Sequence, residues 1–338
     1  MKNILVVSVN WLGDVIFSLP VYQAIKENCP DARVTVFCVP RVSEVLSLCP
    51  HIDEIMVFDE KGRDRSFFRR LVCVIKLRKR KFDAVFMLRP SFSRACLMWL
   101  AGIPLRIGFG NPAAPWPLTL AGAMPDSRNT HRSDIYSHLV TVAGFKLTDR
   151  ISRLSLSSAL RVAACSFLQA RGLPQDGAYV VLNTGGNWDL KQWPADCFAL
   201  LAQRLVKETK YKIVLPGGPS DRSRANEIAS SLGRSAIVVA GETDIPMLAA
   251  IMSGAVMVIS ADSGPLHLAS ALGVATVAIF GPTRPELTGP RGTGRGVVLQ
   301  KDTGCNRAAC YYLECSDNIC MKQVSVDDVF SSVLRLHN

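Results

Sequence analysis

The sequence predicts an α/β protein made of two similar halves, each built around a doubly wound parallel sheet. Three observations support this prediction. Short apolar runs alternate with helical segments, the pattern restarts near residue 179, and polar or glycine-rich loops follow the apolar runs. A length of 338 residues suits about two domains, and an apolar fraction of 49% is ample for two packed cores.

In the first half, Ile4–Ser8 is apolar throughout, as expected for a strand buried on both faces. Gly13 allows a tight turn before a predicted helix at Ile16–Asn28. Further strands are expected at Arg33–Val39, Ile55–Phe58 and Ala84–Leu88, and further helices at Val42–Cys49 and Phe67–Arg80. The segment Asn111–Arg132 contains four prolines and few periodic apolar positions, which predicts a long loop.

The second half follows a predicted bridging helix at Arg161–Arg171. Strands are expected at Tyr179–Asn183, Lys212–Pro216, Ile237–Ala240, Val256–Ser260 and Thr276–Phe280, and helices at Ala195–Thr209, Ser223–Leu232, Ile245–Met252 and Pro265–Leu272. A short helix at Val324–Leu336 closes the chain. We therefore expect Rossmann-like domains at residues 1–158 and 159–322 and a closing helix within 323–338. The strand ends of both domains are expected to face a central cleft.

The net charge of +11 favours an anionic partner such as a phosphorylated sugar, an anionic lipid or nucleic acid. No apolar run reaches the roughly 18 residues that a transmembrane helix needs. The first residues form an apolar run that lacks a small-residue cleavage site, so they are interpreted as a strand rather than a signal peptide. These observations predict a cytoplasmic protein whose eleven cysteines are mostly reduced.

The loop Asn10–Asp14 follows the first strand and opens a helix. It has a single glycine where a dinucleotide site needs G-x-G-x-x-G, so NAD or FAD binding is not expected. Asp14 is either a general base at the carboxyl end of a strand or an ordinary cap of the helix, and the spacing favours neither.

The segment Ser260–His267 pairs an acid with a helix start. Pro265 suits the first helical turn, and the backbone N–H groups of Ser263 and Gly264 can form an anion site at the helix start. Asp262 can accept hydrogen bonds from sugar hydroxyls, which we favour over a simple capped helix. His267 lies within the helix and ranks below Asp262.

Two further strand ends carry glycines with a charged side chain. After Asn183 come Gly185, Gly186, Asn187 and then Lys191, which can present a point charge to a phosphate. After Leu215 come Gly217 and Gly218 with Asp221, which can hold ribose hydroxyls. The alternatives are a solvated lysine and a polar turn.

The stretch Lys61–Lys81 contains ten cationic residues and one acid, Asp64, interleaved with apolar side chains. This composition is typical of a helix that lies on an anionic membrane surface, although a solvated helix face is the alternative. No nucleic-acid motif is present, so nucleic acid is not an expected partner.

Four cysteines near the end of the chain, Cys305, Cys310, Cys315 and Cys320, are spaced every five residues. Zinc or iron–sulfur sites usually contain C-x2-C or C-x4-C pairs, and three equal gaps are unusual. We favour ordinary thiols over a metal site and predict no metal in the protein.

Taken together, these segments resemble glycosyltransferase family 9, the bacterial lipopolysaccharide heptosyltransferases. The resemblance covers nearly the whole chain. It is carried by Asn10–Asp14, Lys191–Pro194, Gly217–Asp221, Gly241–Thr243 and Asp262–His267 with Phe280–Thr283. Arg89–Ser93 and Ala101–Pro104 look more like the second heptosyltransferase of the core pathway than the first.

The resemblance implies a GT-B fold with an acceptor-binding N-terminal domain and a C-terminal domain that holds the donor ADP-heptose. It implies that Asp14 is the general base, Lys191 a catalytic contact to the diphosphate, Asp221 a ribose contact and Asp262 a heptose contact. Donor binding is expected from Gly185, Gly186, Asn187, Lys191, Asp221, Gly241, Glu242, Thr243, Asp262, Ser263, Gly264 and His267. Acceptor binding is expected from Asn10, Trp11, Gly13, Lys61, Arg63, Arg89, Ser91, Arg94 and Arg106.

The implied reaction is an inverting transfer of heptose to lipid A-linked core oligosaccharide, by a monomer that needs no cofactor and associates with the inner leaflet of the inner membrane. Another nucleotide sugar or acceptor is the alternative within the family. A non-catalytic binder of anionic glycolipid is the weaker alternative.

Overall fold

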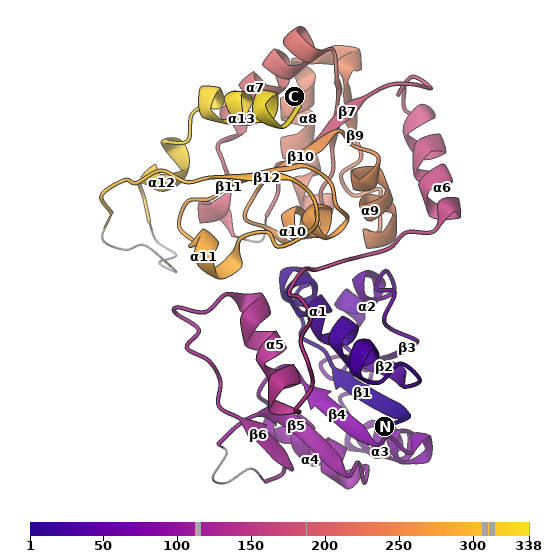
Figure 1. The fold of residues 1–338 in the computed structure, drawn as a ribbon. Helices are drawn as coiled ribbons and strands as arrows, with labels where there is room; N and C mark the ends of the chain where they lie inside the picture. The colour runs from indigo at the N-terminus through magenta and orange to yellow at the C-terminus, as the bar shows by residue number, and fades with distance from the viewer. Residues whose placement is uncertain (112–115, 187, 306–309, 311–314, 338) are drawn as a thin grey trace. The chain divides into compact units, whose positions relative to one another are not determined.

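The computed structural model describes residues 1–338 except 112–115, 187, 306–309, 311–314 and 338. The chain forms two compact units, Met1–Ser152 and Arg153–Asn338. Each contains a six-stranded parallel sheet flanked by helices, which confirms the predicted α/β class (Figure 1).

The sheet of the first unit has the order β3-β2-β1-β4-β5-β6, with every neighbouring pair parallel. Its strands are β1 (Asn3–Val7), β2 (Arg33–Cys38), β3 (Glu54–Val57), β4 (Ala84–Met87), β5 (Leu105–Phe109) and β6 (Leu120–Gly122). The two central strands are almost wholly buried because helices cover both faces of the sheet.

Helices of the first unit cover the sheet in two groups (Figure 1). One group is α1 (Leu12–Asn28), α2 (Pro40–Leu46) and α5 (Arg132–Val142), and the other is α3 (Phe67–Arg80) and α4 (Phe92–Leu100). Helices α4 and α5 and strand β5 were not predicted from the sequence. Helix α4 has only nine residues and lies between Pro90 and Gly102. Helix α5 is capped by a histidine, since the ring nitrogen Nδ1 of His131 accepts a hydrogen bond from Ser133 N.

The prediction of a loop at Asn111–Arg132 is wrong for residues 120–122, which form the edge strand β6. Just before β6, Thr119 N donates to Arg106 O, and Arg106 N donates to the Thr119 hydroxyl. These hydrogen bonds align β6 with β5. A side chain at Gly122 would collide with Val142, so glycine lets α5 pack directly on this strand.

The second unit repeats the strand order of the first, as β12-β11-β10-β7-β8-β9. Its strands are β7 (Tyr179–Asn183), β8 (Lys212–Leu215), β9 (Ala236–Val238), β10 (Met257–Ala261), β11 (Thr276–Ile279) and β12 (Gly296–Leu299). The edge strand β12 was not predicted, because its residues alternate between exposed and half-buried and so lack a continuous apolar run.

Helices α7 (Ala195–Thr209), α8 (Arg222–Ser230) and α13 (Val326–His337) pack together in the second unit, and α6 (Ser158–Gln169), α9 (Ile245–Ser253) and α10 (Gly264–Ala271) form another group. The short elements are α11 (Pro285–Thr288), α12 (Ile319–Lys322) and the 3-10 turns η1 (Asp189–Lys191), η2 (Pro219–Asp221) and η3 (Gly233–Ser235). The closing helix α13 joins the core of this unit, where the indole of Trp193 donates to Val324 O at 2.8 Å.

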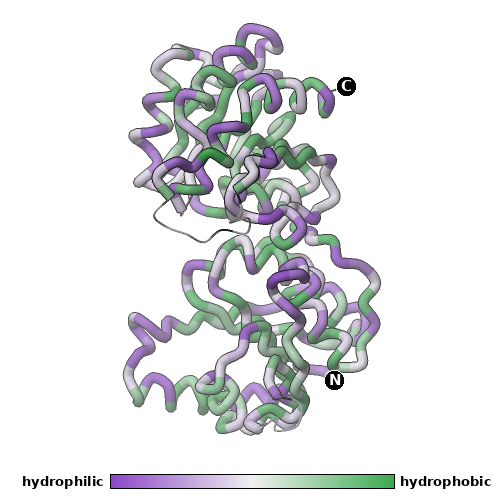
Figure 2. The backbone as a smooth tube through the Cα atoms, turned by 90° about the vertical axis from the view of Figure 1, so that its left-hand side faces the viewer, coloured by the Kyte–Doolittle hydropathy of each residue, from purple (hydrophilic) through white to green (hydrophobic). Residues whose placement is uncertain are grey.

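Hydrophobic stretches of chain gather inside each unit, and hydrophilic stretches lie mostly on outer turns (Figure 2). Among the described residues, no helix is both long and apolar enough to cross a membrane.

Candidate functional site

Both sheets reverse their winding at one point, between β1 and β4 in the first unit and between β7 and β10 in the second. Ligands of open parallel sheets bind beyond the carboxyl ends of the strands at this switch point. Asp14 lies at the start of the helix that follows β1, and the loop after β4 carries Arg89 and Ser91. The segments after β7 and β10 carry Lys191 and Asp262. The two predicted groups of site residues therefore lie at equivalent places in the two units.

Asp14 lies in the first turn of α1 but does not cap it. The N-cap is Trp11, and no side chain caps the helix. Instead, the hydroxyl of Tyr136 on α5 donates to Asp14 Oδ1 at 2.9 Å. The carboxylate is therefore held by a tertiary hydrogen bond and is not the N-cap of the helix.

The hydroxyl of Tyr136 keeps its proton and is therefore the hydrogen-bond donor to Asp14. Burial raises its pKa far above the usual range, and the negative charge of Asp14 raises it further. The hydroxyl therefore orients one oxygen of the carboxylate and leaves Oδ2 for another partner.

Asn10 and Trp11 line the start of the same helix. The Asn10 side-chain oxygen is buried and has no hydrogen-bond partner among the described residues. Trp11 is half exposed, and the guanidinium of Arg41 stacks on its ring at 4.3 Å from the centroid. A buried acceptor without a partner beside an exposed aromatic ring is typical of a ligand site.

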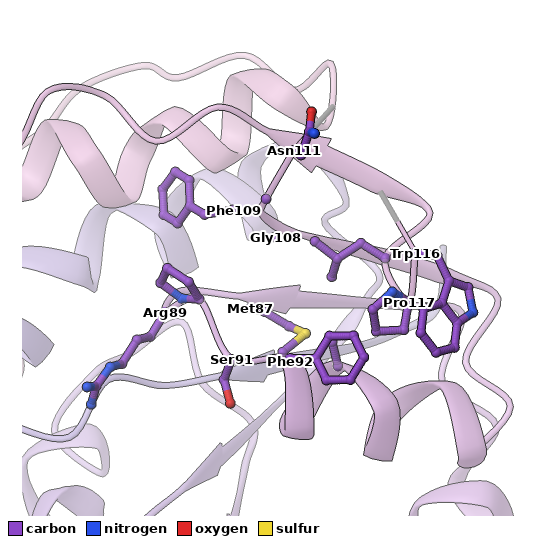
Figure 3. Close-up of a pocket in the computed structure, with 13 residues that line it drawn as sticks. Met87, Arg89, Ser91, Phe92, Gly108, Phe109, Asn111, Trp116 and Pro117 are labelled. Atoms are coloured by element: carbon purple, nitrogen blue, oxygen red, sulfur yellow. The ribbon is translucent and has the colours of Figure 1, made fainter. Parts of the chain in front are cut away.

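Arg89 and Ser91, which follow β4, line a pocket of about 290 Å³ with aromatic walls. Phe92, Trp116 and Pro117 gather on one side, and Arg89 extends on the opposite side (Figure 3). Ser91 also caps α4, since its hydroxyl accepts from Arg94 N at 3.4 Å.

Two of the arginines predicted to bind the acceptor already have protein partners. Arg94 forms an ion pair with Glu60 at 2.7 Å and donates to Ser8 O, so it joins the loops after β1 and β3. Arg106 donates to the carbonyls of Ile103, Pro104 and Pro117 near the start of β5. The structure does not bring Arg106 to the carboxyl ends of the strands. Lys61 and Arg63 are exposed in the loop after β3.

In the second unit, Lys191 and Asp262 form a direct ion pair with Lys191 Nζ 2.7 Å from Asp262 Oδ2. Thr283 Oγ1 donates to the same oxygen at 2.7 Å, and His267 Nε2 lies 3.3 Å from Oδ1. The ammonium of Lys191 is therefore held by an ion pair in the segment that follows β7, and the lysine is not a solvated surface side chain.

Asp262 is 5% exposed and stays ionised. Burial alone opposes the charge, but His267 and Lys191 outweigh it and hold the pKa of Asp262 well below its usual range. Because both of its oxygens are engaged, the carboxylate fixes the positions of Lys191 and His267.

The start of α10 lies directly after Asp262. Its N-cap residue Ser263 makes no side-chain cap hydrogen bond, and its hydroxyl lies near Asn183 and Ser260. The first backbone N–H groups of a helix have no partner within the helix and favour an anion. The nearby Thr184 hydroxyl is buried and has no partner among the described residues.

The glycine loops after β7 and β8 pack closely around Asp221, and the loop after β9 packs against Pro219. Gly218 N donates to Asp221 Oδ2 at 2.8 Å, and a side chain at Gly185 would collide with this carboxylate. Gly241 adopts a φ of +77° and donates to Gly217 O, which joins the loops after β8 and β9. Glycine permits both close approaches.

Glu242 and Thr243 follow in the loop after β9. Glu242 is bound by Arg171 at 2.8 Å and by Arg222 at 2.9 Å, and the hydrogen bond from Arg171 is the main cause of its lowered pKa. Gly186 O accepts from Gln192, and the predicted contact Asn187 lies outside the described residues.

Three residues of these sites were not predicted from the sequence, namely Tyr136, Thr283 and Thr184. Tyr136 lies on the helix that was not predicted, 122 residues from Asp14. Thr283 lies in the predicted Phe280–Thr283 segment, but its partner could not be inferred from spacing. Thr184 directly follows the predicted strand Tyr179–Asn183, and the two glycines after it were the signal in the sequence that it belongs to the site.

The four cysteines all line one pocket of about 440 Å³ beside Arg284 and Lys301. Asn318 N donates to Cys315 Sγ at 3.4 Å. Among the residues that the structure describes, no three cysteine, histidine or acidic side chains are grouped closely enough to hold a metal ion.

Comparison with known proteins gives one consistent result. Residues 70–314 match the family described as Glycosyltransferase family 9 (heptosyltransferase). Lipopolysaccharide heptosyltransferase 2 of Salmonella typhimurium is 26% identical over 300 residues, which are 85% of each chain. The crystal structure of the glycosyl transferase family 9 from Veillonella parvula superposes with a TM-score of 0.86 at 25% identity, covering 99% of this chain and 97% of the other. E. coli ADP-heptose lps heptosyltransferase II superposes with a TM-score of 0.83 at 24% identity, covering 100% and 98%.

Proposed function

The chain belongs to glycosyltransferase family 9 and has the GT-B fold, and from its two strand-end sites we propose that it transfers heptose from ADP-L-glycero-D-manno-heptose to the inner core of lipopolysaccharide. The acceptor is of the heptosyl-Kdo2-lipid A type. The similar proteins of Salmonella and E. coli are lipopolysaccharide heptosyltransferases, and that of E. coli is an ADP-heptose enzyme, which supports an ADP-heptose donor and a lipopolysaccharide acceptor.

One observation supports the proposal above all others. A carboxylate that is oriented but not used as a cap lies at the switch point of one sheet, and a cation beside a helix start lies at the equivalent point of the other. A transferase needs both a base for the attacking hydroxyl and positive charge for a departing diphosphate. A binding protein needs neither.

The proposed reaction is an inverting displacement. Asp14 takes the proton of an acceptor hydroxyl while that oxygen forms a bond to the anomeric carbon of heptose. The bond from this carbon to the β-phosphate oxygen breaks, and ADP leaves with the electron pair. Lys191 and the backbone N–H groups of Ser263 and Gly264 stabilise the charge that develops on the diphosphate.

The ammonium of Lys191 is held by the carboxylate of Asp262 at 2.7 Å. We propose that Lys191 also donates hydrogen bonds to the diphosphate of the donor. Asp262 and His267 contact the heptose. Asp221 holds the ribose, and the Gly241–Thr243 loop lies beside the adenine. Gly185, Gly186 and Asn187 complete the donor site. The Lys191 ammonium and the α10 start supply positive charge, so the proposed reaction uses no cofactor.

On the acceptor side, Asn10, Trp11 and Gly13 surround the proposed base. Lys61, Arg63, Arg89 and Ser91 contact the phosphorylated acceptor. Arg94 acts through the loops that it joins, since its guanidinium is bound to Glu60. These assignments place acceptor binding in residues 1–158 and donor binding in residues 159–322.

We propose that the protein works in the cytoplasm as a monomer, attached peripherally to the inner leaflet of the inner membrane through its basic segment Lys61–Lys81. The acceptor is lipid-anchored, so attachment keeps enzyme and acceptor at one surface.

The proposed base is tested with Asp14→Asn. The variant is expected to lose at least about a hundredfold in the rate of heptosyl transfer, with unchanged binding of ADP-heptose. The matched control is Asp31→Asn, which removes an exposed carboxylate in the same unit. Transfer at near-normal rate by the Asp14 variant would contradict the assignment.

A further inference from the structure

Helix α3 has two apolar faces, and only one of them is covered. Cys73 and Leu77 are buried in the core of the first unit. Phe67, Leu71 and Ile75 follow one another at four-residue intervals on the opposite side of the helix. An amphipathic helix of a soluble domain normally keeps that side polar.

The outer apolar side chains are strongly exposed. Phe67 and Phe68 are 75% and 77% exposed, and Leu71 and Ile75 are 47% and 46% exposed. The two phenylalanine rings meet edge to face, with centroids 6.2 Å apart, so they form one protruding apolar tip at the start of α3. Contiguous exposed apolar surface of this kind marks an interaction site.

Basic residues accompany the apolar stripe of α3, which is formed by Phe67, Phe68, Leu71 and Ile75. Most of these basic residues have no acidic partner among the described residues. In Lys61–Lys81, Arg80 pairs with Glu54, and Arg63 lies 3.5 Å from Asp64. For the other eight cations, the structure shows no ion pair within the part of the chain that it describes. They are Lys61, Arg65, Arg69, Arg70, Lys76, Arg78, Lys79 and Lys81.

A groove of about 780 Å³ runs between α3 and the edge strand β3. Its floor includes Phe37, Met56 and Phe58, and its rim carries Arg69, Lys76 and Lys79. An apolar floor below a cationic rim fits an amphiphilic anion, because a phosphate can meet the rim while attached hydrocarbon lies along the floor.

We propose that the outer face of α3 inserts into the headgroup region of an anionic phospholipid bilayer. Phe67, Phe68, Leu71 and Ile75 enter the apolar boundary, and the rim cations of the groove contact lipid phosphates. Nucleic acid would match the charge but leave the apolar stripe exposed to water. A bilayer matches both features.

This inference rests on the membrane attachment in the proposed function and adds hydrophobic insertion to it. Attachment by charge alone is screened by salt, whereas burial of aromatic side chains is not. The two modes therefore separate at high ionic strength.

The test is cosedimentation of the full-length protein with vesicles of phosphatidylcholine and phosphatidylglycerol, at about 0.1 M and about 1 M salt. The double variant Phe67→Ser/Phe68→Ser is expected to bind about tenfold or more weakly at both salt concentrations. The triple variant Arg69→Gln/Lys76→Gln/Lys79→Gln is expected to lose about tenfold or more at the lower concentration only.

Matched controls come from the second unit. Val162→Ser/Leu200→Ser removes apolar side chains that are 65% and 55% exposed, and Lys207→Gln/Arg234→Gln/Lys322→Gln removes exposed cations. Both controls are expected to bind as the unaltered protein does. The Phe67/Phe68 variant is expected to transfer sugar normally to an acceptor that lacks acyl chains, which shows that it is folded.

Unchanged vesicle binding by the Phe67/Phe68 variant, or no vesicle binding by the unaltered protein, overturns the inference and leaves the transferase activity standing. Vesicle binding that depends on Phe67 and Phe68, in a protein without heptosyl transfer, supports the surface and overturns the proposed function.

Discussion

At the residue scale, Asp14 shows how one tertiary hydrogen bond changes the interpretation of a side chain. An aspartate in the first turn of a helix commonly caps it. Here the cap position belongs to Trp11, and Tyr136 binds the carboxylate from a different helix. The side chain is thereby held in one orientation, as a positioned base requires.

Replacing Tyr136 by Phe removes only the hydroxyl that orients this carboxylate. We expect kcat to fall by roughly tenfold while KM for the donor is unchanged.

A fall in kcat at constant KM separates positioning of the carboxylate from a general structural effect of the tyrosine. Tyr211→Phe, which removes a hydroxyl that meets His337 in the second unit, is the matched control. A Tyr136→Phe enzyme with unchanged kcat, or with a raised KM for the donor, would contradict the positioning role.

At the element scale, the closing helix α13 depends on a reciprocal cap at its start. The Ser325 hydroxyl and Asp328 carboxylate bond to each other and to each other's backbone N–H, and Lys301 Nζ lies 2.8 Å from Asp328 Oδ1. The hydrogen bond from Lys301 is the largest cause that lowers the pKa of Asp328 to about 2.

Asp328→Asn is expected to destabilise the protein by about 1 kcal/mol at neutral pH. The folded-state pKa lies below that of the unfolded chain. The stabilisation is therefore full above the unfolded value of about 3.9 and is lost as pH falls through the folded value. Urea denaturation followed by circular dichroism should thus show a difference at pH 7 that disappears near pH 2.

Asp327→Asn is the control for this helix. Asp327 lies in the same turn, but its side chain is 85% exposed, so its pair with Arg204 should contribute little. Equal loss of stability in the two variants, or a difference for Asp328 that persists below pH 2, would contradict the capping role.

At the scale of the whole molecule, the two units repeat one strand order and put their charged loops at the same topological position. The proposed division of labour predicts that nucleotide binds to the second unit. ADP at about a hundred times its Kd should stabilise the folded protein by about 2.7 kcal/mol. A thermal-shift series with ADP, UDP, GDP and CMP should therefore show the largest rise in Tm with ADP.

Lys191→Met should remove most of the ADP-dependent rise in Tm, whereas Lys207→Met, an exposed lysine on α7, should not change it. A larger shift with UDP or GDP would contradict the choice of donor and favour another family 9 transferase.

The sequence alone was sufficient to predict the α/β class, the central strands and the strand-end loops that carry Asp14, Lys191 and Asp262. These features depend on local apolar runs and on the turn residues that follow them, both of which are visible over a few positions. The edge strands β6 and β12 and the helices α4 and α5 were not predicted, because they are short or lack a continuous apolar pattern.

Tertiary structure alone decided what these side chains contact. Tyr136 meets Asp14 across 122 residues, and Lys191 meets Asp262 across 71 residues. Similarly, Arg94 and Arg106 were predicted to bind an acceptor, but packing engages one with Glu60 and the other with backbone carbonyls. The physical reason is that a side chain's partner is set by how the elements pack, and residue type and spacing along the chain do not contain that information.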